Sequence, residues 1–129
     1  MRAQVSVEFI IVLALLLILF LSLVSSVHTR RTAVRLYNTE ASAKQVAVSL
    51  AESAQRIYLM GNNTQETFDM PAQLSGDFNY TITLVHHLVV VRWSGFMFTL
   101  PSVYQFNVSS IPTGQLISLS NNNGVIGVG

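Results

Sequence analysis

The sequence predicts an α+β protein in which a long N-terminal α-helix with an apolar first half packs on a small antiparallel β-sheet or sandwich. Three observations lead to this prediction. Residues 4–60 contain neither glycine nor proline, so no helix breaker interrupts them. The first part of this stretch is almost wholly apolar. After residue 61 the hydrophobic period changes from helical to alternating.

Residues 4–27 are the predicted membrane-spanning part of the helix. From Phe9 to Val24 only Ser22 interrupts the apolar run. At about 1.5 Å of rise per residue, this run spans most of a roughly 30 Å hydrocarbon core. A removable secretory signal has a shorter apolar core with a small-residue cleavage site after it, whereas here such a site precedes the core. We therefore expect the segment to persist as an anchor or a packed helix.

Residues 28–60 are expected to continue the helix outside the membrane as an amphipathic segment. Its apolar surface suits either the protein's own β-domain or the helices of other subunits, and the sequence leaves both open. Gly61, followed by two asparagines, ends the helix because these residues tolerate a left-handed backbone. The apolar positions form one row of Ala33, Leu36, Ala43, Ala47, Leu50, Ala54 and Ile57, beside a second of Val34, Tyr37, Ala41, Val48, Ala51 and Tyr58.

Residues 61–129 are predicted to form the β-domain. Residues 78–84 alternate between apolar and polar side chains, as in a half-buried strand. Ser94-Gly95 is predicted to join residues 88–93 and 96–100 in a tight hairpin. Further short strands are expected at residues 105–108, 115–119 and 125–128, separated by turns at Pro101, Pro112-Thr113-Gly114 and Asn121-Asn122-Asn123-Gly124.

The composition bounds the class of protein. Hydrophobic residues make up 50% of the 129 residues and charged residues 10%, which is unusual for a small soluble domain. The net charge of +1 gives no field that attracts nucleic acid. The lack of cysteine excludes disulfides and thiolate metal sites. Because no catalytic or phosphate-binding motif is present either, we expect no enzyme activity, no cofactor and no nucleic-acid partner.

The residues before the apolar run carry a specific pattern. A basic stub and the small Ala3 are followed by Gln4, Ser6, Glu8 and Phe9 in the register Gln, any residue, Ser, any residue, Glu, large apolar residue. This junction resembles the class III signal peptide of archaeal type IV pilins, although many members have glycine where Ala3 stands. The resemblance covers only the junction and the apolar helix.

The resemblance implies how the chain is processed and assembled. A prepilin peptidase would remove residues 1–3 by cutting between Ala3 and Gln4. The precursor, held in the membrane, would then polymerise with the help of an assembly ATPase and platform into an extracellular surface filament, most commonly for cell adhesion. The filament-core helix would contribute Phe9, Ile10, Leu13, Leu16, Leu17, Phe20 and Leu23. Two alternatives stay open: a minor pseudopilin, and a permanently anchored single-span surface protein with a binding β-domain.

Glu8 is the residue with the strongest functional signal. An ionised carboxylate in an apolar setting is costly unless it is paired. Cleavage before Gln4 would expose an α-amino group that is mostly protonated at neutral pH. Pairing between Glu8 of one subunit and the Gln4 amine of its neighbour would favour one axial stagger in the filament. Otherwise, Glu8 lies at the membrane surface or reaches the amine of its own chain.

The flanks of the apolar run and three sequons bear on orientation. Positive residues tend to remain cytoplasmic, and the Arg30-Arg31-Arg35 cluster slightly outnumbers Arg2 plus the initiator amine, so charge alone leaves the topology undecided. The resemblance places residues 61–129 outside the cell, where acids such as Glu40 or Glu66 of neighbouring subunits would meet the arginines. Possible N-glycosylation sites, which favour an outside location, are Asn62, Asn79 and Asn107.

Other polar and aromatic residues have simpler interpretations. His86 and His87 are adjacent, so in a strand they would face opposite sides and would not bind one metal ion. Trp93, Phe96 and Phe98 suit the core of the sheet better than a ligand platform. The run from Asn121 to Asn123 is expected to be a solvated loop.

Overall fold

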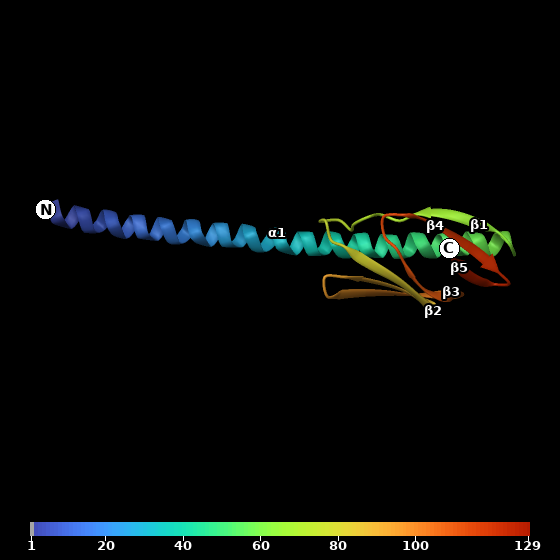
Figure 1. The fold of residues 1–129 in the computed structure, drawn as a ribbon. Coiled ribbons are helices and arrows are strands. Elements are labelled where there is room, and N and C mark those ends of the chain that lie inside the picture. The colour runs from blue at the N-terminus through green and yellow to red at the C-terminus, as the bar shows by residue number, and fades with distance from the viewer. Residues whose placement is uncertain (1) are drawn as a thin grey trace. The chain divides into compact units, whose positions relative to one another are not determined.

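The computed structural model describes residues 2–129, with side chains from Ser6 onward. One helix is followed by five strands, as Figure 1 shows, and the α+β prediction is confirmed. The chain divides into two compact units, one ending at Leu36 and one comprising Tyr37–Gly129. The elements are α1 (Arg2–Met60), β1 (Gln65–Asp69), β2 (Tyr80–Trp93), β3 (Phe96–Ile111), β4 (Leu116–Asn122) and β5 (Val125–Val128).

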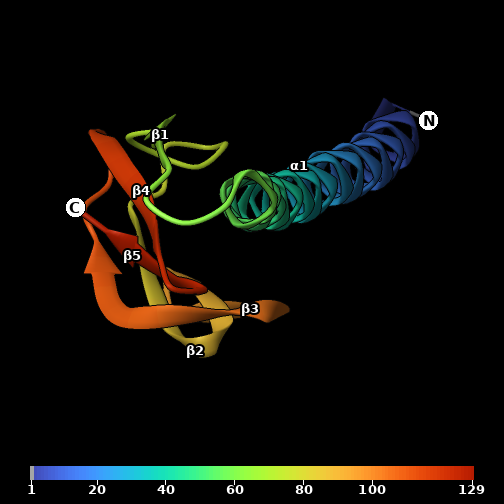
Figure 2. The ribbon, with the colours of Figure 1, turned by 90° about the vertical axis from the view of Figure 1, so that its right-hand side faces the viewer.

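The strands form a single five-stranded sheet in the order β1-β4-β5-β3-β2, which lies on one side of the last part of α1 (Figure 2). Three of its four strand pairs are antiparallel, as predicted. The exception is β3 with β5, a parallel pair of only two residue positions. It arises because β5 folds back on β4 in a hairpin and thereby comes to lie beside β3, so the sheet is mixed.

The strands are longer and fewer than the sequence predicts. Residues 78–84 and 88–93 were expected as two strands, but β2 runs through both, with register shifts on either side of His86. His86 has φ 46°, so a β-bulge rather than a turn separates the two halves. Pro101, which the sequence predicts as a turn between two strands, lies within β3 opposite Leu88. β5 pairs with β3 only at Gln105 and Phe106. β5 therefore requires no backbone N–H from residue 101, and a proline, which has none, is tolerated there.

Two tight hairpins set the register of the sheet. Ser94 and Gly95 have φ values of 40° and 82°, typical of the twisted turn that joins antiparallel strands, so the predicted β2–β3 hairpin is confirmed. Asn123 and Gly124, with φ values of 56° and 87°, make the same kind of turn between β4 and β5. Asn121 and Asn122 belong to β4 and Asn121 is buried, so the solvated loop predicted for this run is wrong at Asn121. Asn122 and Asn123 are exposed, and Asn123 lies in the turn.

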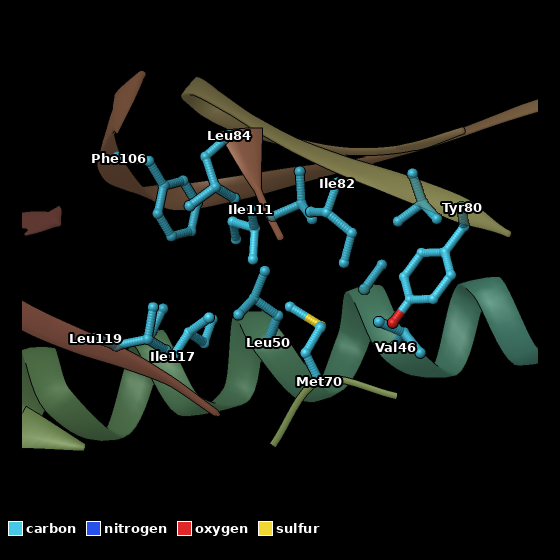
Figure 3. Close-up of a cluster of buried hydrophobic side chains, with 14 of the residues drawn as sticks. Val46, Leu50, Met70, Tyr80, Ile82, Leu84, Phe106, Ile111, Ile117 and Leu119 are labelled. Carbon is cyan, nitrogen blue, oxygen red and sulfur yellow. The ribbon is translucent and has the colours of Figure 1, made fainter. Parts of the chain in front are cut away.

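The core of the second unit lies between α1 and the inner face of the sheet (Figure 3). On α1, the fully buried apolar residues are Ala43, Ala47, Leu50, Ala54 and Ile57, which confirms this part of the first predicted row. The second row is not buried: Tyr37 and Tyr58 are exposed, and only Val48 and Ala51 are partly covered. Opposite the helix, the buried residues include Tyr80, Ile82, Leu84, Phe106, Ile111, Ile117 and Leu119.

The carbonyl groups at the end of α1 accept hydrogen bonds from one residue close to the helix and one far along the chain. Gly61 has φ 102°, as expected after a helix. The Thr64 hydroxyl donates to the carbonyls of Ile57 (3.0 Å) and Gly61 (2.7 Å), and the Asn121 amide donates to Gly61 (3.0 Å). Since the last carbonyls of a helix lack partners within it, these bonds explain why a polar Asn121 is buried. Sequence reasoning missed the bond from Asn121 because it joins residues sixty positions apart.

Candidate functional site

The apolar surface of the first unit is the most unusual feature of the molecule. All described side chains from Ser6 to Asn38 are exposed. Between Val7 and Val27, sixteen large apolar residues each keep between 49% and 67% of their surface accessible. They include the seven predicted for the filament core: Phe9, Ile10, Leu13, Leu16, Leu17, Phe20 and Leu23.

Such a surface requires a cover that a single chain does not provide. A soluble monomer rarely exposes a contiguous apolar patch larger than a few hundred Å², because each buried methylene contributes about 0.8 kcal/mol. Within α1, the stretch beginning at Ser6 is long and apolar enough to cross a membrane and is not buried by the protein. Lipid chains or the apolar helices of other molecules are the two kinds of cover that fit.

Glu8 lies at the N-terminal edge of this apolar surface, where its side chain is exposed. It is followed by Phe9 and stands alone there, because no further acidic residue occurs before Glu40. The side chains of Ala3 and Gln4 lie outside the described residues, so their part in the predicted cleavage and pairing stays a prediction.

At the other end of the apolar run, the helix carries only basic charge. His28, Arg30, Arg31 and Arg35 are exposed within two turns. The hydroxyls of Thr29 and Thr32, which lie among them, donate to the carbonyls of Ser25 (3.0 Å) and His28 (3.1 Å). These hydroxyls are therefore satisfied by their own helix.

One acid that was expected to meet these arginines has a different partner. Glu66 on β1 accepts hydrogen bonds from Arg56 of α1, with Nη2 to Oε1 at 2.6 Å and Nε to Oε1 at 3.3 Å. Arg56 also donates to Ser53 at 2.8 Å. The bond to Glu66 raises the pKa of Arg56 above its ordinary value. Glu66 therefore ties the helix to the edge strand within the chain.

The three possible glycosylation sites differ in their surroundings. Asn62, Asn79 and Asn107 are all exposed. The Asn62 amide nitrogen donates to the side-chain oxygen of Asn123 at 2.8 Å, and the Asn62 side-chain oxygen accepts from the Asn123 backbone at 2.8 Å. A glycan on Asn62 would compete with the first of these bonds. Asn79 uses only its oxygen, which accepts from Gln73 at 3.2 Å.

The β2–β3 hairpin carries the aromatic residues Trp93, Phe96 and Phe98. Trp93 is buried and Phe98 packs against the core, as expected for sheet residues. Phe96 is 53% exposed and stacks on Trp93 with a centroid distance of 6.1 Å. A surface hollow of about 540 Å³ adjoins this pair and is also lined by Asn79 and Arg92.

The histidines form no site with other ligands. His86 pairs with Phe106 at the bulge. Nδ1 of His87 lies 3.2 Å from the carbonyl oxygen of Tyr104. Among the residues that the structure describes, no group of three histidine or acidic side chains is placed to hold a metal ion.

Comparison of the chain with family models, with curated proteins and with solved structures finds no match in any of the three.

Proposed function

We propose that this chain is the structural subunit of an extracellular filament, similar to an archaeal type IV pilin, and that it is held in the membrane before assembly. The observation that carries the proposal is the exposed apolar surface between Val7 and Val27. In the precursor, lipid covers this surface. In the filament, the same surfaces of neighbouring copies cover one another at the centre, and the β-domains form the outside, where they serve adhesion.

Glu8 favours a filament over a permanent anchor. A membrane anchor gains nothing from a carboxylate at the edge of its apolar segment, because burial of an unpaired charge is unfavourable. Removal of residues 1–3 would supply the partner, since the new amino group of Gln4 is cationic at neutral pH. Pairing across two subunits then defines how far one helix is displaced along its neighbour.

Assembly requires little change in the apolar contacts of the helix. Lipid tails are about as apolar as leucine and isoleucine side chains, so exchanging lipid for helix contacts is nearly balanced in free energy. Extraction of the helix from the bilayer therefore needs an external supply of energy. This supports a requirement for an ATP-driven assembly machine and a membrane platform as partners.

A permanently anchored surface protein is the competing function. The observation in its favour is the hollow beside Trp93 and Phe96, where a partially exposed aromatic side chain is available for binding. A minor pseudopilin would share the processing of a pilin but would not form the shaft. Stoichiometry in purified filaments separates it from a major subunit.

The decisive experiment is the intact mass of the protein isolated from its native membrane and from surface filaments. For a pilin, we expect the mature chain to begin at Gln4 in both fractions, and electron microscopy to show filaments composed mainly of this chain. A mature protein that still begins at Met1 and occurs only in membranes would contradict the proposal and favour the permanent anchor.

A further inference from the structure

A basic surface follows the apolar run. No aspartate or glutamate occurs between Glu8 and Glu40, whereas Arg30, Arg31 and Arg35 are all exposed in this interval. The acid of α1 nearest in sequence to Arg30 and Arg31 is Glu40, which lies nine residues, or about 13 Å along the helix axis, beyond Arg31, so neither of these two arginines has an acid within two turns of the helix.

The arginines share one side of the helix. At about 100° of rotation per residue, Arg31 and Arg35 lie one turn apart, and Arg30 is next to Arg31 on the same side. Arg30, Arg31 and Arg35 line a common surface groove with Val27 and Val34. We call these three arginines the basic face.

The basic face continues directly into apolar surface. Arg31 also lines a second groove, together with Leu23, Val24, Val27 and His28. Long basic side chains can lie along apolar surface with their charged ends in a polar layer. The basic face is therefore built for a partner that is apolar on one side and anionic on the other.

We propose that the basic face binds the phosphate groups of anionic lipid headgroups. This inference depends on the proposed membrane location of residues 9–24. Arg30 follows Val24 by about 9 Å along the helix axis, which matches the headgroup layer beyond a hydrocarbon core of roughly 30 Å. Guanidinium groups bind phosphate through two parallel hydrogen bonds.

Carboxylates of a second copy, such as the exposed Glu40, are the alternative partner of the basic face in an assembled filament. The only acid on the described part of the first unit is Glu8, which lies at the opposite end of the apolar run. Glu66 of the second unit is held by Arg56 at 2.6 Å. While the helix is in the bilayer, phosphate is the anion present at the depth of the basic face. Binding there would set how deep the precursor sits before assembly.

The test measures lipid binding by the full chain. The protein in neutral detergent micelles is titrated with phosphatidylglycerol or with phosphatidylcholine of the same acyl chains, and native mass spectrometry counts the lipids that remain bound. The chain is compared with Arg30→Gln/Arg31→Gln and with the control Lys44→Gln/Arg92→Gln, which removes two exposed basic residues of the second unit. Vesicle flotation measures membrane insertion of each, and circular dichroism measures helix content.

We expect a preference for phosphatidylglycerol that falls about tenfold or more in Arg30→Gln/Arg31→Gln, since one arginine at an anionic membrane surface strengthens binding about fivefold. The control variant should keep the preference, and all variants should float with vesicles. The inference would be overturned if Arg30→Gln/Arg31→Gln kept the same preference for phosphatidylglycerol as the unaltered chain. It would also be overturned if the unaltered chain showed no lipid preference and instead formed oligomers that depend on these arginines. Neither result would alter membrane insertion. Failure of the unaltered chain to float would instead contradict the proposed function.

Discussion

Tyr80 shows how a single buried polar group joins the sheet to a loop. Its ring packs in the core beside Val46 of α1 (Figure 3), and its hydroxyl donates to the carbonyl of Pro71. Burial raises the pKa of Tyr80 from 10.0 to about 12. The neutral phenol is therefore the form that the folded state retains.

This predicts an alkaline transition that depends on Tyr80. The unfolded chain loses the phenolic proton near pH 10, but the folded state keeps it until about pH 12. The resulting stabilisation is complete below pH 10 and is lost as the pH rises through 12. In an absorbance titration of tyrosinate formation in detergent, Tyr80 should ionise last. Tyr80→Phe should remove that step and lose about 1 kcal/mol of unfolding free energy at neutral pH. Simultaneous ionisation of all four tyrosines near pH 10 would contradict this.

Glu8 is the single residue on which the proposed pairing between filament subunits depends. We predict that Glu8→Ala leaves membrane insertion unchanged, because it makes the exposed surface more apolar, but lowers filament yield about tenfold or more by leaving the buried amine unpaired. Filaments are counted by electron microscopy, and insertion is measured by flotation. Glu52→Ala, which removes an exposed acid of the second unit, is the matched control. Normal filaments from the Glu8→Ala strain would refute the pairing.

At the scale of elements, α1 has two different surfaces. Up to Asn38 its described side chains are exposed on all sides, whereas from Ala43 to Ile57 one narrow row is buried. Three of the five fully buried apolar residues in that row are alanines, which lets the helix backbone lie close to the sheet. A larger side chain at one of these buried alanines would have to displace its neighbours in the core.

The narrow buried row predicts that replacing an alanine by leucine destabilises the protein strongly at a buried position of α1 and very little at an exposed one. Ala47→Leu should lower the unfolding free energy by about 1–3 kcal/mol, because the added atoms overpack a filled core. Ala41→Leu, at an exposed position of the same helix, should change it by less than about 0.5 kcal/mol. Urea unfolding followed by near-UV circular dichroism measures both. Equal effects would show that α1 does not pack on the sheet through this row.

At the scale of the whole molecule, the buried core and the exposed apolar surface belong to different units. All buried residues that the structure describes lie between Thr39 and Ile126. The first unit has an exposed apolar surface that its own chain does not bury, and the second unit has a buried hydrophobic core. Thr39 joins the second unit, because its hydroxyl donates to the carbonyl of Ser75 at 2.8 Å.

This division predicts what truncation does. A chain of residues 28–129 should be soluble without detergent and should melt within a few degrees of the full chain, because it keeps every described buried residue. A chain of residues 44–129 should melt at least several degrees lower, since it lacks Thr39 and Ala43. Thermal melts followed by circular dichroism compare the two. An unfolded 28–129 chain would show that the sheet depends on the apolar segment.

Much of this organisation follows from local sequence. The helix bounds, its stop at Gly61, the apolar segment and the Ser94-Gly95 hairpin are all set by residues close to one another, through backbone preferences and hydrophobic period. The buried row of α1 was predicted as well, because helical spacing alone identifies which side chains share a face. For the candidate site, the sequence alone predicts Glu8 and the seven residues of the proposed filament core, and the structure shows the seven as exposed, while their part in assembly stays a prediction.

Tertiary structure decided the features that join distant residues. The burial of Asn121, the edge strand β1 with its Glu66–Arg56 pair, the bulge at His86 and the parallel contact of β3 with β5 have no local signal. Each depends on where polar groups find partners after the chain has folded, since a buried donor or acceptor must be satisfied wherever a partner lies. The sequence by itself determined which segments are helical, apolar or extended, because those properties depend on neighbouring residues. Only the folded chain determined which polar residues meet.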